Sequence, residues 1–332
     1  MSTSLTPTAG SPLIAVVGAT GNQGGSVVDA LLARGARVRA LVRDPGKLTA
    51  RALADRGVEL TVGDLTDPPS LDGLFDGVDA AFAMTTPLPG GTEQEAATGI
   101  AIANSAARAG VPHLVFSSVG GAERESGVPH FESKRRVEER VEALGIHHTF
   151  LRPVLFMDNL SGFMTSVEDG QVVVRMALPD GIPLQMVAVR DIGRAAAAIL
   201  LGGTAVEGDS VEIAGDTLTG SQIAKAIGAH AGLPARYEAL PLEAIASFGD
   251  TAEMFRWLAE TPAYQADFEA TRALVPAFSP SPTTCIVDVA NIGSSRPGHL
   301  SCTRPAATVT SRVNVLAHGE CASASTSFLS RS

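Results

Sequence analysis

The sequence predicts an α/β fold, a doubly wound parallel sheet of the Rossmann type with a small C-terminal α/β lobe. Two observations support this fold class. Short, continuously apolar segments alternate with helical patterns over the first half of the 332-residue chain, as expected for parallel strands covered on both faces. The first apolar segment also runs directly into a glycine-rich turn and then a helical pattern, which is the arrangement of a dinucleotide-binding crossover.

The first half contains the expected sheet and its helices in regular alternation. Strands are expected at Leu13–Val17, Val38–Val42, Val58–Val62, Ala80–Met84, His113–Ser117 and His147–Leu151. Helices are expected at Val27–Ala33, Lys47–Arg56, Glu93–Ala109 and Glu132–Leu144. Right-handed crossovers between these strands give a doubly wound sheet.

After Leu151 the rhythm changes and indicates a smaller lobe. It is expected to contain a short helix at Phe156–Val167, strands at Gln171–Val174, Gln185–Val189 and Val211–Ala214, and helices near Leu242–Phe248, Ala252–Glu260 and Tyr264–Leu274. Two further helices are expected to end at Leu201 and Ala229. Asp191 and Thr219 are expected to cap them, because a side-chain oxygen can accept the free N–H groups of a first turn.

These patterns divide the chain into four segments. Residues 1–11 are expected to be a flexible tail, 12–152 an NAD(P)-binding Rossmann domain, and 153–275 a smaller substrate or partner lobe partly interleaved with the Rossmann sheet. From Pro276 onward Pro, Ser, Thr, Ala and Cys dominate. Such a segment has little to bury, so residues 276–332 are expected to be disordered.

Charge and cysteine content limit the function classes. A formal net charge of −10 argues against direct nucleic-acid binding, which needs a basic face, and against an anionic membrane surface. The N-terminal residues lack the features of a secretory signal, and the apolar run Ala195–Leu201 is too short to span a bilayer. The protein is therefore expected in the cytosol. Cys285, Cys302 and Cys321 form neither a disulfide framework nor a metal-binding spacing.

The strongest functional signal is the segment Gly18-Ala19-Thr20-Gly21-Asn22-Gln23-Gly24-Gly25. Gly18 permits the tight turn, Gly21 lets the backbone approach a pyrophosphate, and Gly24 lets the helix pack closely. The pyrophosphate would meet the free N–H groups and the positive dipole of the helix start. The alternative is a glycine-rich turn that binds no ligand.

The end of the second strand bears on the choice of cofactor. Sites that prefer NAD usually place an acidic residue there, which binds the ribose 2′-OH. This chain has Arg43, with Lys47 nearby, and a guanidinium can bind a 2′-phosphate through two parallel hydrogen bonds. NADP(H) is therefore favoured over NAD(H). A solvated surface role for Arg43 is the alternative, and Asp44 keeps NAD(H) open.

Two further strand ends are expected to border the same cleft. Asp64 follows the third strand, where its side chain can reach an adenine amino group or cap its own loop. Thr85 and Thr86 follow the fourth strand.

As a set, these residues resemble the NmrA-like family of atypical short-chain dehydrogenases/reductases. The resemblance runs from about Pro12 to about Val275 and rests on Gly18–Gly25, Arg43, Gly63-Asp64, Ser117-Ser118, His130–Lys134 and Leu151-Arg152-Pro153. It implies a cofactor site made of Gly18, Thr20, Gly21, Asn22, Gln23, Gly24, Arg43, Lys47, Asp64, Thr85, Thr86, Lys134, Pro153 and Phe156. The tail after Pro276 does not match the family; an altered reading frame and a natural extension remain open.

The candidate catalytic residues depart from the usual reductase pattern. Active short-chain reductases usually carry Tyr-x-x-x-Lys, in which the Tyr donates a proton and the Lys lowers its pKa. Here Lys134 is present, but His130 stands four residues earlier, on the same helical face. His130 either donates a proton or only lines the cleft. The hydroxyls of Ser117 and Ser118 stand where the family places its substrate-orienting hydroxyl, and they either orient a substrate or bond to the backbone. A surface role for Lys134 is also open.

Two functions follow from this resemblance. One is an NADPH-dependent oxidoreductase of quinones or other small carbonyl compounds, with His130 or water as the proton source. The other is a redox sensor that binds NADP(H) and signals the cofactor's state to a partner protein. A DNA-binding regulator is disfavoured by the acidic charge, and no metal site is expected.

Overall fold

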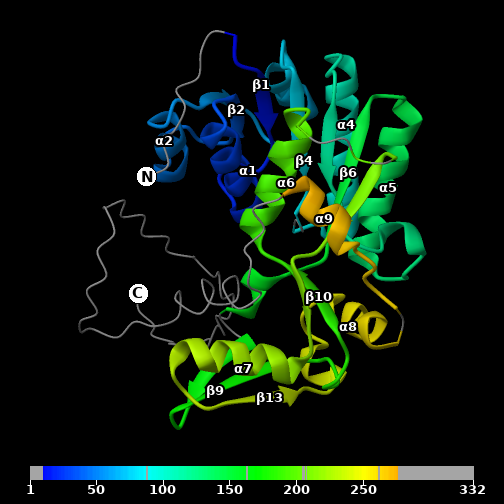
Figure 1. The fold of residues 1–332 in the computed structure, drawn as a ribbon. Helices are drawn as coiled ribbons and strands as arrows, with labels where there is room; N and C mark the ends of the chain where they lie inside the picture. Colours follow the sequence, from blue (N-terminus) through cyan, green and yellow to red (C-terminus); the bar gives the residue numbers. More distant parts are fainter. Residues whose placement is uncertain are drawn as a thin grey trace, which may run out of the picture. The chain divides into compact units, whose positions relative to one another are not determined.

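The computed structural model describes residues 10–86, 89–161, 164–203, 206, 208–260 and 262–275 (Figure 1). Its centre is a seven-stranded sheet in the order β11-β6-β5-β4-β1-β2-β3, and every neighbouring pair is parallel. The strands are β1 (Leu13–Val16), β2 (Arg37–Val42), β3 (Glu59–Val62), β4 (Ala80–Met84), β5 (Leu114–Ser117), β6 (His148–Pro153) and β11 (Ser210–Ile213). The predicted fold class is confirmed.

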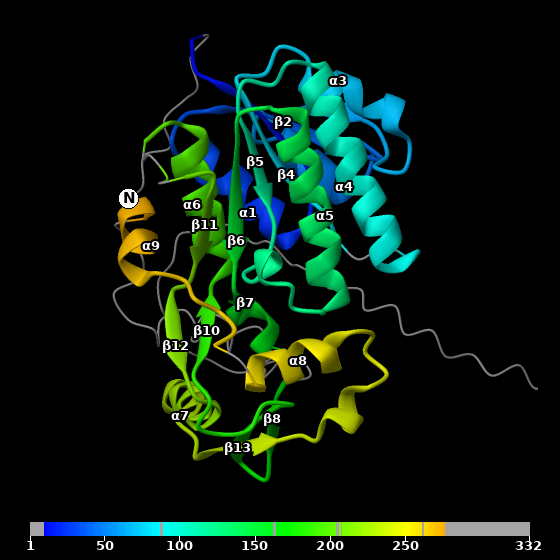
Figure 2. The same ribbon diagram turned by 90° about the vertical axis from the view of Figure 1, so that its right-hand side faces the viewer.

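Helices cover both faces of this sheet (Figures 1 and 2). One face packs against α1 (Asn22–Ala33), α2 (Leu48–Ala54), α6 (Val189–Leu200) and α9 (Phe268–Leu274). The other face packs against α3 (Asp72–Phe75), α4 (Gly91–Arg108) and α5 (Pro129–Leu144). Because strands buried on both faces must be apolar throughout, the continuous runs at β1, β4 and β5 form the middle of the sheet.

The strand order reverses beside β1. The chain builds β1, β2 and β3 outward in one direction and then returns to place β4 on the opposite side of β1. In open α/β sheets, ligands bind at the carboxyl ends of the strands at such a switch point. A ligand site is therefore expected at the loops that follow β1, β2 and β4.

Two small sheets make up most of the C-terminal part. One has the order β12-β10-β7, with β7 (Leu155–Phe156), β10 (Leu184–Val187) and β12 (Asp216–Leu218). The other has the order β13-β9-β8, with β8 (Thr165–Glu168), β9 (Gln171–Met176) and β13 (Ala235–Ala239). They share a second core with α7 (Gly220–Ala231), α8 (Thr251–Glu260) and the short 3-10 helices η3 (Met157–Leu160) and η5 (Leu242–Ile245).

Glycines allow helices far apart in sequence to pack closely. A Cβ on Gly193 of α6 would overlap the backbone and hydroxyl oxygens of Ser26 in α1. A Cβ on Gly99 of α4 would likewise overlap Val137 of α5. On each face of the sheet, therefore, one pair of helices packs closely because a glycine lies at the contact.

The predicted helix at Phe156–Val167 is wrong. Phe156 belongs to β7, which pairs with β10, and the 3-10 helix η3 follows at Met157–Leu160. The Ser161 hydroxyl donates to the carbonyl oxygen of Asp158 and the Thr165 hydroxyl to that of Leu160. Such side-chain bonds compete with helix formation. The helix predicted at Leu242–Phe248 is also shorter, because only the 3-10 turn η5 forms.

One predicted helix cap is wrong and the other is confirmed. Helix α6 begins at Val189, with Ala188 as its N-cap, so that Asp191 lies inside the first turn. The carboxylate of Asp158 accepts the Val189 N–H at 2.9 Å and supplies the missing cap from another segment. Thr219 caps α7 as predicted, in a reciprocal capping box with Gln222.

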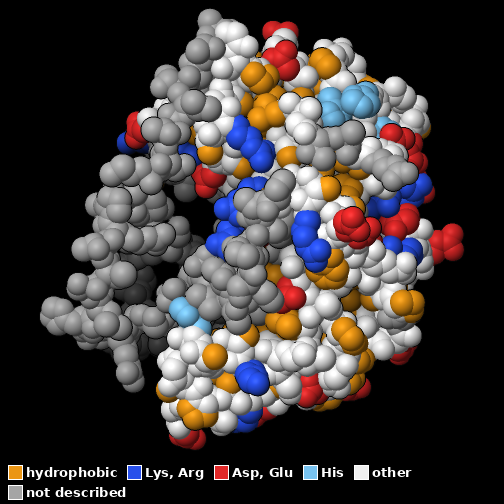
Figure 3. Space-filling view, in the orientation of Figure 1, with side chains coloured by type: hydrophobic (Ala, Val, Ile, Leu, Met, Phe, Trp, Pro, Cys, Tyr) orange, Lys and Arg blue, Asp and Glu red, His pale blue; other side chains and the backbone are white. Residues whose placement is uncertain are grey.

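Several predictions lie outside the described residues, among them the tails at residues 1–9 and 276–332 and the three cysteines. Within the described part of the chain, no helix combines the length and apolar character needed to cross a membrane. On the face drawn in Figure 3, Lys and Arg side chains stand in several separate groups, some of them near the middle of the face.

Candidate functional site

The glycine-rich loop joins β1 to α1 at the switch point of the sheet. Gly18 has φ +76°, a conformation that side-chain-bearing residues rarely adopt, and a Cβ there would lie 3.0 Å from the sulfur of Met84. A Cβ on Gly24 would overlap the Gly18 carbonyl group. The roles predicted for Gly18 and Gly24, a tight turn and a close helix approach, match this geometry.

The start of α1 presents unpaired backbone donors. Gly21 is the N-cap and contributes no side-chain cap. The first hydrogen bond that reaches back runs from Gly25 N–H to the Gly21 carbonyl at 2.8 Å, so the N–H groups of Asn22, Gln23 and Gly24 have no partner among the described residues. Thr20, Gly21 and Asn22 are exposed beside them. Such a helix start attracts an anion through its N–H groups and dipole.

Two cations stand at the end of the neighbouring strand β2. Arg43 and Lys47 are exposed, and their side chains make no hydrogen bond or ion pair with the described residues. Asp44, the alternative acidic residue, accepts the N–H of Gly46 at 2.8 Å. Its carboxylate therefore stabilises the turn that follows Arg43.

Asp64 caps its own loop after β3. Its carboxylate accepts the backbone N–H and the hydroxyl of Thr66 at 2.8 and 2.7 Å, and these bonds lower its pKa. Loop capping was one of the two roles predicted for Asp64. An ionised carboxylate at this strand end can still accept a hydrogen bond from a ligand.

Lys134 is held in a buried network at the end of β4. Its Nζ donates to the carbonyl oxygen of Thr85 at 2.8 Å and to the Thr85 hydroxyl at 2.6 Å. It also pairs with Glu95 Oε1 at 2.9 Å. The other carboxylate oxygen of Glu95 accepts from the Ser133 hydroxyl at 3.0 Å. A surface role for Lys134 is therefore wrong.

Burial and charge act on Lys134 in opposite directions. Desolvation lowers the pKa of its ammonium group, whereas the charge and the hydrogen bond of Glu95 raise it. The side chain of Glu95 is 1% exposed and that of Lys134 12% exposed. Because a buried ammonium needs a partner to remain charged, Glu95 controls both the position and the charge of Lys134.

The two serines after β5 differ in their surroundings. Ser117 is buried, and its hydroxyl accepts a hydrogen bond from the Gln23 side-chain amide. The hydroxyl of Ser118 is also buried and has no partner among the described residues. The hydroxyl of the predicted catalytic residue Ser117 is thus hydrogen-bonded to the glycine-rich loop. The hydroxyl of Ser118 has its hydrogen-bonding capacity unused by the described residues.

His130 lies in the first turn of α5 and pairs with Asp250, which precedes α8. Asp250 Oδ2 accepts the backbone N–H of His130 at 2.7 Å and lies 2.8 Å from His130 Nδ1. The His130 ring packs edge-to-face against Phe131 at 4.6 Å. The side chain of His130 is 27% exposed, so its position allows contact with a small molecule.

The remaining predicted residues lie after the strands of the main sheet or in the chain that follows them. Thr86 is exposed after β4, and Pro153 ends β6 as a buried residue. Phe156 is half-buried three residues after β6, in β7 of a small sheet.

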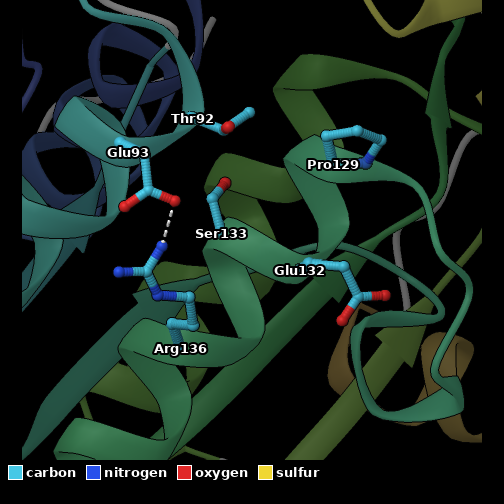
Figure 4. Close-up of a pocket in the computed structure, with 6 residues that line it drawn as sticks. All are labelled: Thr92, Glu93, Pro129, Glu132, Ser133 and Arg136. Carbon is cyan, nitrogen blue, oxygen red and sulfur yellow. Dashed lines mark hydrogen bonds and ion pairs between the residues drawn. The ribbon is translucent and has the colours of Figure 1, made fainter.

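A small pocket adjoins the Lys134 network. Its volume is about 240 Å³, and it opens between the N-terminal turns of α4 and α5 (Figure 4). Glu93 and Arg136 point toward one another across it and form an ion pair at 2.6 Å. Its lining residues are Thr92, Glu93, Pro129, Glu132, Ser133 and Arg136.

The described residues contain no cluster of three His, Cys, Asp or Glu side chains that could hold a metal ion. His113 and His147 stack at 4.2 Å. They lie before β5 and β6, at the amino ends of these strands, away from the edge that carries the candidate site.

Sequence reasoning missed Glu95 and Asp250 as site residues. Glu95 did give a signal, because it falls on the buried stripe of α4 with Gly99 and Ile102, where an acidic residue is unexpected. Asp250 gave none. Its place before α8 resembles a helix cap, and only the fold brings it to His130.

The sequence is similar to those of known proteins. The model of the NmrA-like family matches residues 11–284. The chain is 35% identical over 233 residues to the NAD(P)H azoreductase of Xenophilus azovorans, covering 70% of this chain and 78% of that protein. The match reaches beyond Val275, so residues 276–284, assigned above to the unmatched tail, fall within the family model.

Solved structures share the fold. NmrA, a negative transcriptional regulator in complex with NADP, superposes with a TM-score of 0.72 at 24% identity, covering 85% of this chain and 96% of that chain. The NADPH-dependent quinone oxidoreductase of Escherichia coli, complexed with NADPH, gives a TM-score of 0.70 at 24% identity, covering 84% and 99%.

Proposed function

Because the chain belongs to the NmrA-like family, we propose that it binds NADP(H) at the carboxyl edge of its sheet and reduces a small aromatic acceptor such as a quinone. The observation that carries the cofactor assignment is the start of α1. There, three backbone N–H groups have no partner among the described residues, and glycines at 18 and 24 let the loop lie tightly against the helix. A diphosphate fits this site, because it supplies the acceptors that the helix start lacks.

Arg43 and Lys47 support a preference for the phosphorylated cofactor. Both are exposed, follow the strand next to the diphosphate site, and make no hydrogen bond or ion pair with the described residues. The charge of Arg43 acts on the carboxylate of Asp64, but no ion pair holds its guanidinium, which is available for a 2′-phosphate. Asp64 at the next strand end would accept a hydrogen bond from the adenine amino group.

The residues after β4, β5 and β6 would form the reaction site. NADPH, when bound, supplies the hydride. Thr85 and Lys134 would hold the nicotinamide ribose, while Pro153 and Phe156 would border the ring and the acceptor. His130 would supply the proton in place of the usual Tyr. The similarity to an NAD(P)H azoreductase supports an acceptor with an extended aromatic system.

A second candidate is a regulator that binds NADP(H) and senses its redox state. The observation that favours it is Lys134, whose three donor positions are all taken by Thr85 and Glu95, so that the lysine is not free for chemistry without rearrangement. The fungal nitrogen metabolite repression protein nmrA is 33% identical over 195 residues. Such a sensor must bind its partner with different affinity in the two cofactor states.

Steady-state oxidation of NADPH separates these two functions. The purified protein is expected to consume NADPH in the presence of simple quinones or azo dyes, and Lys134→Met is expected to reduce kcat. Absence of turnover across such a panel, in a protein that still binds NADPH, would rule out the reductase and leave the sensor.

A further inference from the structure

We infer that Asp250 orients His130 for proton transfer, so that the C-terminal part of the chain supplies half of the proton-donating pair. This inference rests on the proposed reductase function. Asp250 belongs to the segment between η5 and α8 and lies 120 residues from His130 in the sequence. It is a positioning residue, because it acts through the imidazole of His130.

The geometry fixes which ring nitrogen carries the proton. A single oxygen of Asp250 accepts the backbone N–H of His130 at 2.7 Å and meets Nδ1 at 2.8 Å. An ionised carboxylate only accepts hydrogen bonds, so the neutral ring must hold its proton on Nδ1. The bond to the backbone restrains the same residue, so that the carboxylate sets both the tautomer and the orientation of the ring.

The other ring nitrogen is available for chemistry. Nε2 of His130 has no hydrogen-bond partner in the part of the chain that the structure describes, and the side chain is partly exposed. A histidine whose Nδ1 is bound to a carboxylate and whose Nε2 faces a ligand is the usual arrangement of a general acid or base. His130 also lies one helical turn before Lys134, on the same face of α5.

The step balances without a further co-reactant. Bound NADPH would supply a hydride, which is one proton with two electrons, and would be left as NADP⁺. A quinone that accepts this hydride and the proton from His130 Nε2 would become a hydroquinone. His130 changes from imidazolium to neutral imidazole, with the remaining proton on Nδ1 held by Asp250, and solvent returns a proton to Nε2.

Capping of α5 alone does not account for this contact. The N–H of His130 is one of the free donors of the first turn, since Val128 is the N-cap and provides no side-chain cap. A cap would need only that backbone bond. The second bond, to the ring, is what a positioning role requires, and the two roles predict different results on mutation.

A double-mutant cycle with a spectroscopic measurement tests the inference. The variants are Asp250→Asn, Asp250→Ala, His130→Gln and Asp250→Ala in the His130→Gln background. We expect Asp250→Ala to lower kcat about 10- to 100-fold with little change in KM for NADPH. In the His130→Gln background it should have no further effect, because the group through which it acts is absent. Glu253→Gln, an exposed carboxylate three residues away, is the matched control and should leave kcat unchanged.

The tautomer of His130 gives a measurement that does not need turnover. Long-range ¹H–¹⁵N correlation on histidine-labelled protein with NADP⁺ bound should show Nδ1 protonated in the wild type, with the signal assigned by its loss in His130→Gln. In Asp250→Ala, which removes the oxygen that accepts from Nδ1, the population should shift toward the Nε2-protonated form. Asp250→Asn keeps an oxygen that can accept from both the backbone N–H and Nδ1–H, so it is the matched variant that should retain the wild-type tautomer.

The outcomes distinguish the inference from the function on which it depends. An unchanged tautomer in Asp250→Ala, or additive losses of kcat in the double variant, would overturn the role of Asp250 while leaving the reductase intact. A wild-type protein without turnover on the whole panel would overturn the reductase function, and with it any role of Asp250 in proton transfer.

Discussion

Single residues decide whether the loop after β1 can hold a diphosphate. Gly24 lies against the backbone of Gly18, and no side chain can be accommodated between them. The next residue, Gly25, is different, since a Cβ there would lie 3.4 Å from the Ala19 carbonyl oxygen, an ordinary contact. The two glycines therefore have separate roles although they are adjacent.

Gly24→Ala is expected to weaken NADPH binding at least about 10-fold, because the loop must move away from α1 to admit the methyl group, and a 10-fold loss corresponds to about 1.4 kcal/mol. Isothermal titration calorimetry measures this loss. Gly25→Ala is the control, and it should bind as the wild type does. Equal binding by both variants would show that close packing of the loop against the helix is not needed.

His113 provides a pH-dependent prediction at the same scale. Burial, followed by the charges of His147 and His148, lowers the pKa of His113 to about 4. Its folded pKa is thus below that of the unfolded chain, about 6.5, so the unfolded chain binds a proton first as the pH falls. Stability from this site should be complete above about pH 6.5 and decline toward pH 4.

Thermal melting between pH 4 and pH 7 measures this decline. His113→Gln should flatten the acid limb of the curve, whereas His230→Gln, at an exposed histidine of α7, should leave it steep. The same slope in both variants would contradict the assignment to His113.

At the scale of elements, α4 and α5 are joined by two ion pairs of different burial. Glu95 and Lys134 form the inner pair, with side chains 1% and 12% exposed. Glu93 and Arg136 form the outer pair, with side chains 79% and 46% exposed. A buried pair that loses one partner leaves an uncompensated charge, whereas solvent screens an exposed pair.

Double-mutant cycles on the two pairs should therefore differ. Glu95→Gln and Lys134→Met are each expected to cost roughly 3 kcal/mol of unfolding free energy, and their combination should cost clearly less than the sum. The cycle through Glu93→Gln and Arg136→Gln is expected to give a coupling below about 1 kcal/mol. Denaturant unfolding measures both. Additive losses at Glu95 and Lys134 would show that they do not act as a pair.

The elements also show how far the sequence could predict the fold. The main sheet follows from continuous apolar runs, and Ala80–Met84 was predicted with the bounds that β4 has. The segment at Phe156–Val167 could not be predicted, since its apolar residues fit a helix and only pairing with β10 makes Phe156 a strand residue. Asp158 was not expected to cap α6 because the two segments meet only in the folded chain.

The residues of the candidate site likewise fall into those that the sequence could predict and those that it could not. Residues that follow strands were predictable, because the carboxyl ends of parallel strands meet at one edge. Partners brought in from other segments were not, and Asp250 and Glu95 both belong to that class. Arg152 is a further example of a contact that the sequence does not predict. It was one of the residues on which the family resemblance rests, and in the fold it forms a buried ion pair with Glu138 at 2.8 Å. No local sequence pattern indicates this pair.

At the scale of the whole molecule, the net charge of −10 leads us to expect a small-molecule ligand rather than a nucleic acid. A 2′-phosphate needs only a local pair of cations, which Arg43 and Lys47 provide after β2, whereas a nucleic acid needs an extended basic surface.

Calorimetric titration with NADPH and NADH, on the wild type and on Arg43→Ala, tests the central claim most directly. We predict that the wild type binds NADPH more tightly than NADH. Arg43→Ala should lose roughly 10- to 100-fold in affinity for NADPH, as expected for loss of a charged hydrogen-bonding pair, with NADH binding unchanged. Failure of the folded wild type to bind either nucleotide would contradict the assignment of the site after β1 to a dinucleotide.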